Sequence, residues 1–178
     1  MLLLFQPAPG FTQNGSQTIK LHTEGRYSEG VARATRELEA IERAKGKDHI
    51  DTAEALNTLA LLYHGLGDYG KAEPLLTRAL SIREKVRGPS HLETAVSLNN
   101  LAMLYQDTGA YARAEPLYKR ALAIRREKLP ADHPDLAASL NNLATLDYAL
   151  GNFEQAIALF KEATSIWEKS LGPDHPGL

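Results

Sequence analysis

The chain repeats itself with a period of 42 residues, and this period limits its fold more than any other feature. Residues 48–89 and 90–131 are identical at 20 of 42 aligned positions, and residues 90–131 and 132–173 at 16 of 42. An eroded copy precedes them, in which Gly25, Tyr27, Arg36 and Leu38 keep the same phase. A regular period of this length predicts stacked supersecondary units that bury their apolar faces against one another.

Each copy contains two segments with the apolar spacing of an amphipathic helix. The first is followed by a glycine, at 67, 109 or 151, which can end the helix in a left-handed conformation. Small residues such as Ala102, Ala114 and Ala121 allow the two helices to cross closely. The predicted helices lie near 27–45, 51–66, 69–87, 92–108, 111–128, 134–150 and 153–170. Residues 1–13 are expected to be irregular, and any helix at 14–23 short.

The six histidines also follow the repeat. His49, His91, His133 and His175 lie 42 residues apart, as do His22 and His64. Equivalent residues of successive repeats are separated by about 10 Å, the packing distance of helices, whereas zinc needs its nitrogen ligands within about 2.1 Å. We therefore interpret the repeated histidines as linker and helix-start residues, and we expect no metal and no cofactor.

Composition and missing motifs argue against several classes of function. The chain has no cysteine, and its net charge of −2 shows no basic region that would attract a nucleic acid. Phosphate-binding loops, nucleophile elbows and metalloprotease motifs are absent, so we expect no catalytic residues and no enzyme activity. The apolar run at the N-terminus is too short to cross a membrane. These features favour a cytoplasmic protein without nucleic-acid or membrane partners.

The motifs of the repeat resemble those of a known family. Leu-x-x-Leu-Ala-x-x-Tyr, then Gly-x-Tyr-x-x-Ala, is similar to the tetratricopeptide repeat (TPR), and the 42-residue period with LNNLAxLY and GPDHP resembles its kinesin light chain-like subtype. The resemblance implies an all-α, right-handed α-solenoid of antiparallel helix hairpins. The expected organisation is an irregular segment (1–13), a degenerate first repeat (14–47), three further repeats (48–89, 90–131 and 132–173), and the start of a truncated repeat (174–178).

A polar stripe on the first helix of each hairpin is the main candidate for function. In a stack of hairpins the first helices line the inner wall, so this stripe is expected to face a concave groove. The resemblance implies that asparagines of the LNN segment hold a ligand peptide by its main chain, which points to Asn100 and Asn142, with Thr58 as a weaker counterpart. The candidate peptide-binding residues are Asn57, Thr58, His64, Asn99, Asn100, Met103, Gln106, Asn141, Asn142 and Tyr148.

Two alternatives remain open at this point. One asparagine of each pair could instead cap or brace the neighbouring repeat. The chain could also be a structural, oligomerisation or sensor segment of a larger multi-repeat protein, because Phe160, Ile166 and Trp167 in the last copy would offer apolar surface with nothing downstream to bury it. The sequence thus predicts a scaffold that binds a peptide or partner protein, with self-association through the C-terminal hairpin as the rival function.

Overall fold

The computed structural model describes residues 26–171, and all regular secondary structure in this range is helical. The helices are α2 (Tyr27–Lys45), α3 (Ile50–Gly65), α4 (Tyr69–Arg87), α5 (Leu92–Asp107), α6 (Tyr111–Lys128), α7 (Pro134–Ala149) and α8 (Phe153–Leu171). Every bound agrees with the sequence prediction within one residue. The predictions for residues 1–13, 14–23 and 174–178, and those for His22 and His175, lie outside the described residues.

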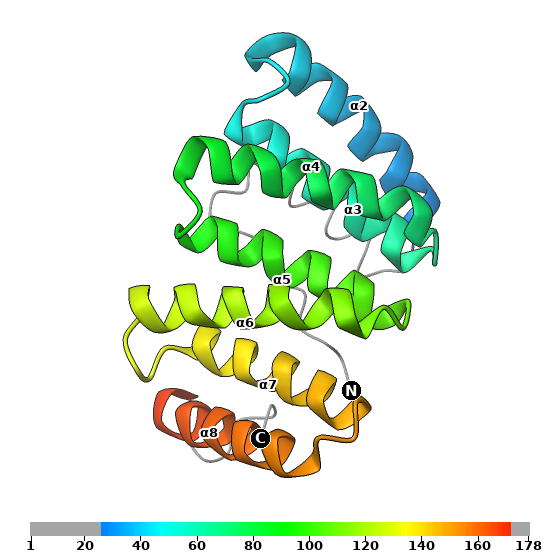
Figure 1. Cartoon of the computed structure of the whole chain (residues 1–178). Helices are drawn as coiled ribbons and strands as arrows, with labels where there is room; N and C mark the ends of the chain where they lie inside the picture. The colour runs from blue at the N-terminus through cyan, green and yellow to red at the C-terminus, as the bar shows by residue number, and fades with distance from the viewer. Residues whose placement is uncertain (1–25, 172–178) are drawn as a thin grey trace.

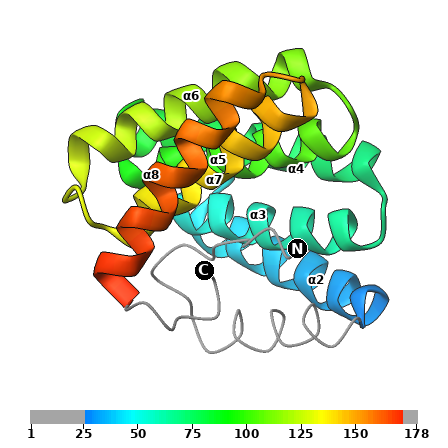
Figure 2. The ribbon, with the colours of Figure 1, turned by 90° about the horizontal axis from the view of Figure 1, so that it is seen from below.

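The helices form one continuous stack. Each packs mainly against the helix before it and the helix after it, and α5 also touches α7. The chain therefore builds three hairpins, α3–α4, α5–α6 and α7–α8, with α2 at the other end of the column (Figures 1 and 2). None of the described helices is both long and apolar enough to cross a membrane.

The turn inside each hairpin is set by its glycine. Gly67, Gly109 and Gly151 have φ angles of 73°, 75° and 82°, a left-handed conformation that is unfavourable for residues with a Cβ atom. The next residue then donates its N–H to a carbonyl of the last helical turn, as Ala110 does to Tyr105 at 2.7 Å. The predicted C-cap role of these glycines is confirmed.

The start of each first helix is capped by a histidine. His49, His91 and His133 accept hydrogen bonds at Nδ1 from the backbone N–H two residues later, at 3.2, 3.1 and 3.1 Å. Their interpretation as helix-start residues is confirmed: each of the three serves a different helix.

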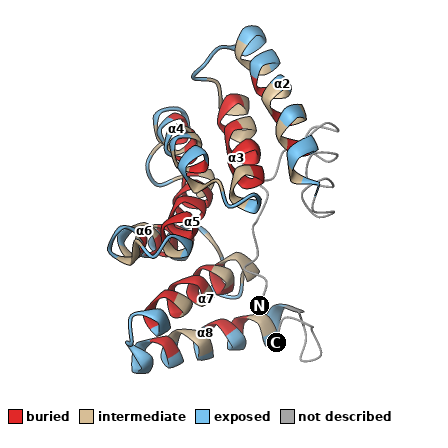
Figure 3. Ribbon diagram, turned by 90° about the vertical axis from the view of Figure 1, so that its right-hand side faces the viewer, coloured by how far each residue is buried: buried red, intermediate tan, exposed pale blue. Residues whose placement is uncertain are grey.

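Buried residues concentrate on the first helices. Figure 3 shows them along α3, α5 and α7, whereas α2 and α8 carry more intermediate and exposed positions. The largest apolar cluster runs from α3 to α8 and contains fully buried alanines such as Ala60, Ala102 and Ala114. A larger side chain at these positions would force the closely packed helices apart, as the sequence indicated.

A buried arginine joins each of two second helices to the first helix that follows. Arg83 of α4 donates to Ser97 Oγ of α5 at 2.7 Å, and Arg125 of α6 donates to Ser139 Oγ of α7. Burial lowers the pKa of both guanidinium groups below their ordinary value. At the equivalent α2–α3 positions, Ile41 and Ala55 replace the arginine and the serine. The polar pair is thus replaced as a unit.

Ion pairs link consecutive second helices, and we call this series the second-helix ladder. Glu42 of α2 pairs with Arg78 of α4 at 2.6 Å, and Glu84 of α4 pairs with Arg120 of α6 at 2.6 Å. The third pair has the charges reversed, with Arg126 of α6 on Glu162 of α8 at 2.8 Å. Each pair joins residues 36 positions apart in the sequence.

The predicted apolar surface at the C-terminal hairpin needs one correction. Ile166 is only 7% exposed and belongs to the core, like the equivalent Ile82 and Ile124. Trp167 is partly buried against the same core, and Phe160 is half-buried. The strongly exposed apolar side chains of α8 are instead Phe153 and Ile157, each 55% exposed.

Candidate ligand-binding surface

Four equivalent positions on each of α3, α5 and α7 make up the surface that we call the first-helix stripe. These are Glu54, Asn57, Leu61 and His64 on α3; Val96, Asn99, Met103 and Gln106 on α5; and Ala138, Asn141, Thr145 and Tyr148 on α7. Their spacing of three and four residues places each set on one face of its helix. Most members on α3 and α5 are buried, whereas those on α7 are half-buried or, in the case of Tyr148, 62% exposed.

The asparagines of this region bond to one another. Asn100 Nδ2 donates to Asn57 Oδ1 at 2.7 Å, and Asn142 Nδ2 donates to Asn99 Oδ1 at 2.8 Å. All four side chains are buried. The structure therefore shows the bracing alternative for these two pairs, which tie α3 to α5 and α5 to α7. The amides that the resemblance assigned to a ligand are engaged between repeats.

Three other predicted site residues differ in their surroundings. Thr58 is buried and donates its hydroxyl to the Glu54 carbonyl at 3.1 Å. Met103 is buried in the main apolar cluster. Asn141 on α7 occupies the position of Asn57 and Asn99, but its side-chain amide has no hydrogen-bond partner within the described part of the chain. Asn141 is thus the open end of the asparagine series.

Two acceptor oxygens of the stripe are buried and have no hydrogen-bond donor among residues 26–171. They are Glu54 Oε1 on α3 and Gln106 Oε1 on α5. Burial raises the pKa of the Glu54 carboxyl above its ordinary 4.5, and the positive charge of Arg83 partly offsets this rise. A buried acceptor without a donor is unfavourable by about 1–3 kcal/mol. Both atoms are closed off from solvent, so a ligand that supplies N–H groups could reach them only if the two half-buried side chains turned outward.

His64 marks the end of the stripe on α3. Its Nε2 lies 2.6 Å from Asp107 Oδ2 on α5, and its ring packs edge-on against Tyr69 with centroids 5.3 Å apart. The structure thus joins His64 of α3 to Asp107 of α5. Tyr148 lies elsewhere, on α7, with its ring against Phe153 at 5.4 Å. The described residues hold no group of three His, Asp or Glu side chains arranged for a metal ion.

Sequence reasoning missed the roles of Asp107 and of a neighbouring cluster. Tyr105 donates to Glu73 at 3.0 Å, Arg113 donates to the same carboxylate at 2.7 Å, and the Arg113 guanidinium lies 3.9 Å from the centre of the Tyr105 ring. The Arg113 hydrogen bond lowers the pKa of Glu73 below its ordinary value. In the last repeat Asp147 replaces the tyrosine and accepts from Asn152 at 3.2 Å. The sequence shows that Asp147 replaces Tyr105 in the last repeat, but it does not show that Tyr105, Glu73 and Arg113 form a cluster.

The stack of helix hairpins defines a helical repeat protein, and the family follows from its sequence. The profile of the tetratricopeptide repeat matches residues 21–85, 66–127 and 136–177. The chain therefore belongs to the tetratricopeptide repeat family. No curated protein sequence matches it.

Solved structures with the same fold include kinesin light chain-like proteins. BtubC (BKLC) from P. vanneervenii has a TM-score of 0.79 and 24% identity, over 92% of this chain and 65% of that one. A putative kinesin light chain of Podosopora anserina with nearly identical TPR-like repeats gives the same score and identity, over 92% and 77%. A Rap protein complexed with competence and sporulation factor has a TM-score of 0.73 and 20% identity, over 88% and 42%. At these identities the likeness establishes the fold, and the chain spans just under two thirds of BtubC.

Proposed function

We propose that this chain is a protein-interaction scaffold that holds an extended peptide segment of a partner along the first-helix stripe. Membership of the tetratricopeptide repeat family supports an interaction role. The Rap protein with the same fold, solved with competence and sporulation factor bound, offers a precedent for a ligand on this architecture. Fold alone does not define function, so the proposal depends on the chemistry of the stripe.

The unpaired acceptors Glu54 Oε1 and Gln106 Oε1 carry the proposal. An extended peptide exposes backbone N–H groups along its length, and these are the donors that both oxygens lack. The two atoms belong to consecutive first helices, α3 and α5. The Asn57–Asn100 hydrogen bond, 2.7 Å long, links these two helices. Both oxygens are buried in the free chain, so Glu54 and Gln106 would turn outward to contact the peptide, while the asparagines fix the spacing of the binding surface.

The remaining stripe residues indicate what kind of peptide would fit. The Asn141 amide, which has no hydrogen-bond partner among the described residues, can both donate and accept, and Tyr148 exposes an aromatic ring on the same face of α7. A peptide that runs on from α3 and α5 to α7, with a backbone amide beside Asn141 and an apolar side chain beside Tyr148, would use both features. The carboxylates of Glu54 and Asp107 disfavour a strongly acidic ligand.

Selection from a random peptide display library, followed by titration of a selected peptide, tests this proposal. We expect Gln106→Ala and Glu54→Ala each to weaken binding by about threefold to tenfold, because one net hydrogen bond contributes about 0.5–1.5 kcal/mol. Gln155→Ala is the matched control, since it removes an exposed amide from α8. The proposal would be contradicted if Gln106→Ala and Glu54→Ala left binding unchanged while Gln155→Ala weakened it. The ligand would then bind elsewhere.

A second function, self-association through the C-terminal hairpin, is favoured by the exposure of Phe153 and Ile157 on α8. Phe160 and Trp167 remain candidates for such contacts, whereas Ile166 is buried in the core. This role uses a different part of the molecule from the first-helix stripe.

A further inference from the structure

Glu54 is the only carboxylate of the first-helix stripe. Its equivalents one and two repeats later are Val96 on α5 and Ala138 on α7. The helix packing of the repeat therefore requires no charge at this position, since a valine and an alanine occupy it elsewhere in the same stack. A half-buried carboxylate that packing does not require is a candidate for ligand recognition.

The Glu54 carboxylate has no bonded partner in the described part of the chain. It forms neither a hydrogen bond nor an ion pair there, and its Oε1 is buried. The charge of Arg83 influences the carboxyl, but Arg83 donates its hydrogen bond to Ser97 Oγ on α5, at 2.7 Å. A carboxylate in this position has lost water without gaining a donor, which is unfavourable.

The charges around Glu54 favour the approach of a further cation. Burial is the main cause of the raised pKa of Glu54, Arg83 lowers that pKa, and three nearby carboxylates raise it again, namely Asp51, Glu93 and Glu37. Lys45 and Arg87 are already paired with the first two of these acids. Neither cation is therefore free to neutralise Glu54.

We propose that the peptide held by the first-helix stripe carries a lysine or arginine, and that Glu54 turns outward to pair with this side chain. The inference rests on the proposed function and deepens it by naming the chemistry of the ligand. A basic side chain supplies both the N–H donors and the positive charge that Glu54 lacks. Because Val96 and Ala138 offer no carboxylate, the basic residue would fit at α3 only, which sets the register of the peptide on the stripe.

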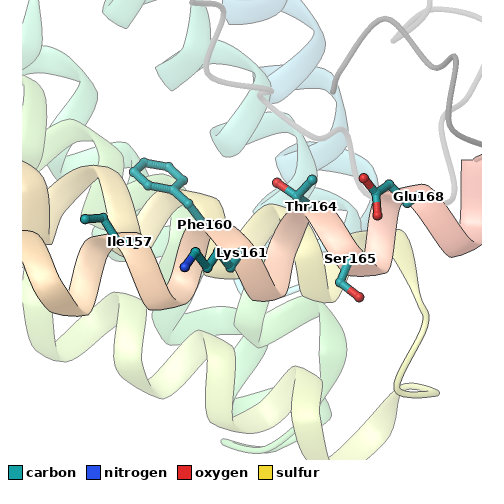
Figure 4. Close-up of a pocket in the computed structure, with 6 residues that line it drawn as sticks. All are labelled: Ile157, Phe160, Lys161, Thr164, Ser165 and Glu168. Carbon is teal, nitrogen blue, oxygen red and sulfur yellow. The ribbon is translucent and has the colours of Figure 1, made fainter.

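A second carboxylate lies in a shallow hollow on α8, which Figure 4 shows. The hollow is lined by Ile157, Phe160, Lys161, Thr164, Ser165 and Glu168. Glu168 is exposed, but the positive charge of Lys161 in the same hollow opposes a basic ligand. Glu168→Gln is therefore the matched control, because it removes the same charge as Glu54→Gln at a place where we expect no basic side chain to bind.

Parallel selections from one random peptide display library test the preference for a basic residue. The targets are the unchanged protein, Glu54→Gln and Glu168→Gln, each checked for folding by circular dichroism. We expect lysine or arginine to be enriched at one peptide position on the unchanged protein and on Glu168→Gln, and this enrichment to disappear on Glu54→Gln. The same enrichment on all three targets, or none on the unchanged protein, would overturn the inference.

Titration of a selected peptide, and of its variant with methionine in place of the basic residue, measures the pairing directly. We expect Glu54→Gln to weaken binding of the basic peptide by roughly threefold to tenfold, and to change binding of the methionine variant by less than about twofold. Glu168→Gln should affect neither peptide. An equal effect of Glu54→Gln on both peptides would show that Glu54 does not contact the basic side chain.

Gln106→Ala separates failure of this inference from failure of the proposed function. If Gln106→Ala weakens binding of selected peptides that show no preference for a basic residue, the stripe binds peptides and only the role of Glu54 is wrong. If neither Gln106→Ala nor Glu54→Gln changes the binding of any selected peptide, the ligand does not lie on the stripe, and both proposals are wrong.

Discussion

At the scale of single residues, the buried asparagines show how a side chain suited to ligand binding can serve the array instead. Asn100 is 1% exposed, and its amide nitrogen lies 2.7 Å from Asn57 Oδ1. An amide in such a place is favourable only when its partner is also present, because a buried unpaired acceptor retains the full cost of desolvation. The pair therefore fixes the register between α3 and α5.

This predicts that Asn100→Ala is destabilising. Removing the donor leaves Asn57 Oδ1 buried and unpaired, so the free energy of unfolding should fall by about 1–3 kcal/mol. Asn141→Ala is the matched control: it makes the same change on α7 at a side chain without a hydrogen bond in the described part of the chain, and should change stability by less than about 0.5 kcal/mol. Urea unfolding followed by circular dichroism measures both. Equal losses in the two variants would show that the hydrogen bond contributes nothing.

Much of the molecule could be predicted at this scale because the deciding contacts are local. A histidine cap bonds to an N–H two residues away, and a glycine turn depends on its own φ angle, so the sequence around each is sufficient. The partner of Asn100 lies 43 residues away on another helix. Choosing between ligand binding and bracing required the distance between α3 and α5, which no local pattern contains.

At the scale of helices, the interface between α6 and α7 combines an apolar core with one buried polar pair. Arg125 donates to Ser139 Oγ and to the Asp135 carbonyl, the latter at 3.2 Å. The α2–α3 interface has Ile41 and Ala55 at these positions and needs no such bond. The same helix packing is thus achieved with a polar or an apolar pair, provided that both members match.

We therefore expect strong coupling in a double-mutant cycle at this interface. Ser139→Ala alone removes a buried acceptor from Arg125, and Arg125→Ile alone leaves the Ser139 hydroxyl without its donor. The double variant reproduces the Ile41–Ala55 pair and should be more stable than the sum of the single losses predicts, by about 1 kcal/mol or more. Chemical denaturation of the four proteins measures the coupling. Additive losses would mean that the two side chains act independently.

The one wrong surface residue also belongs to this scale. The sequence predicts apolar surface at Ile166, but Ile166 packs inward within its own hairpin, as Ile82 and Ile124 do. The burial of Ile166 follows from the 42-residue repeat, because equivalent residues of a repeat have equivalent neighbours. The contacts of α6 with the hairpin after it indicate which side of α8 a following hairpin would cover.

At the scale of the whole molecule, stability should vary along the stack. Each helix contacts little beyond its chain neighbours, so repeats stabilise one another mainly across shared interfaces. α5 packs against α4, α6 and α7, whereas among the described helices α2 packs chiefly against α3 and α8 against α7. The ends of the column therefore have fewer contacts to lose on opening than its centre.

Hydrogen exchange of the intact chain, followed by mass spectrometry at low protein concentration, should resolve this gradient. We expect amides of α2 and α8 to exchange fastest and those of α5 slowest, because local opening needs less free energy where fewer interfaces break. Asn100→Ala should speed exchange in α3 and α4 more than in α7 and α8, since it weakens the contact between α3 and α5. Uniform exchange along all helices would instead indicate one cooperative unit, in which the loss of any interface unfolds the entire stack.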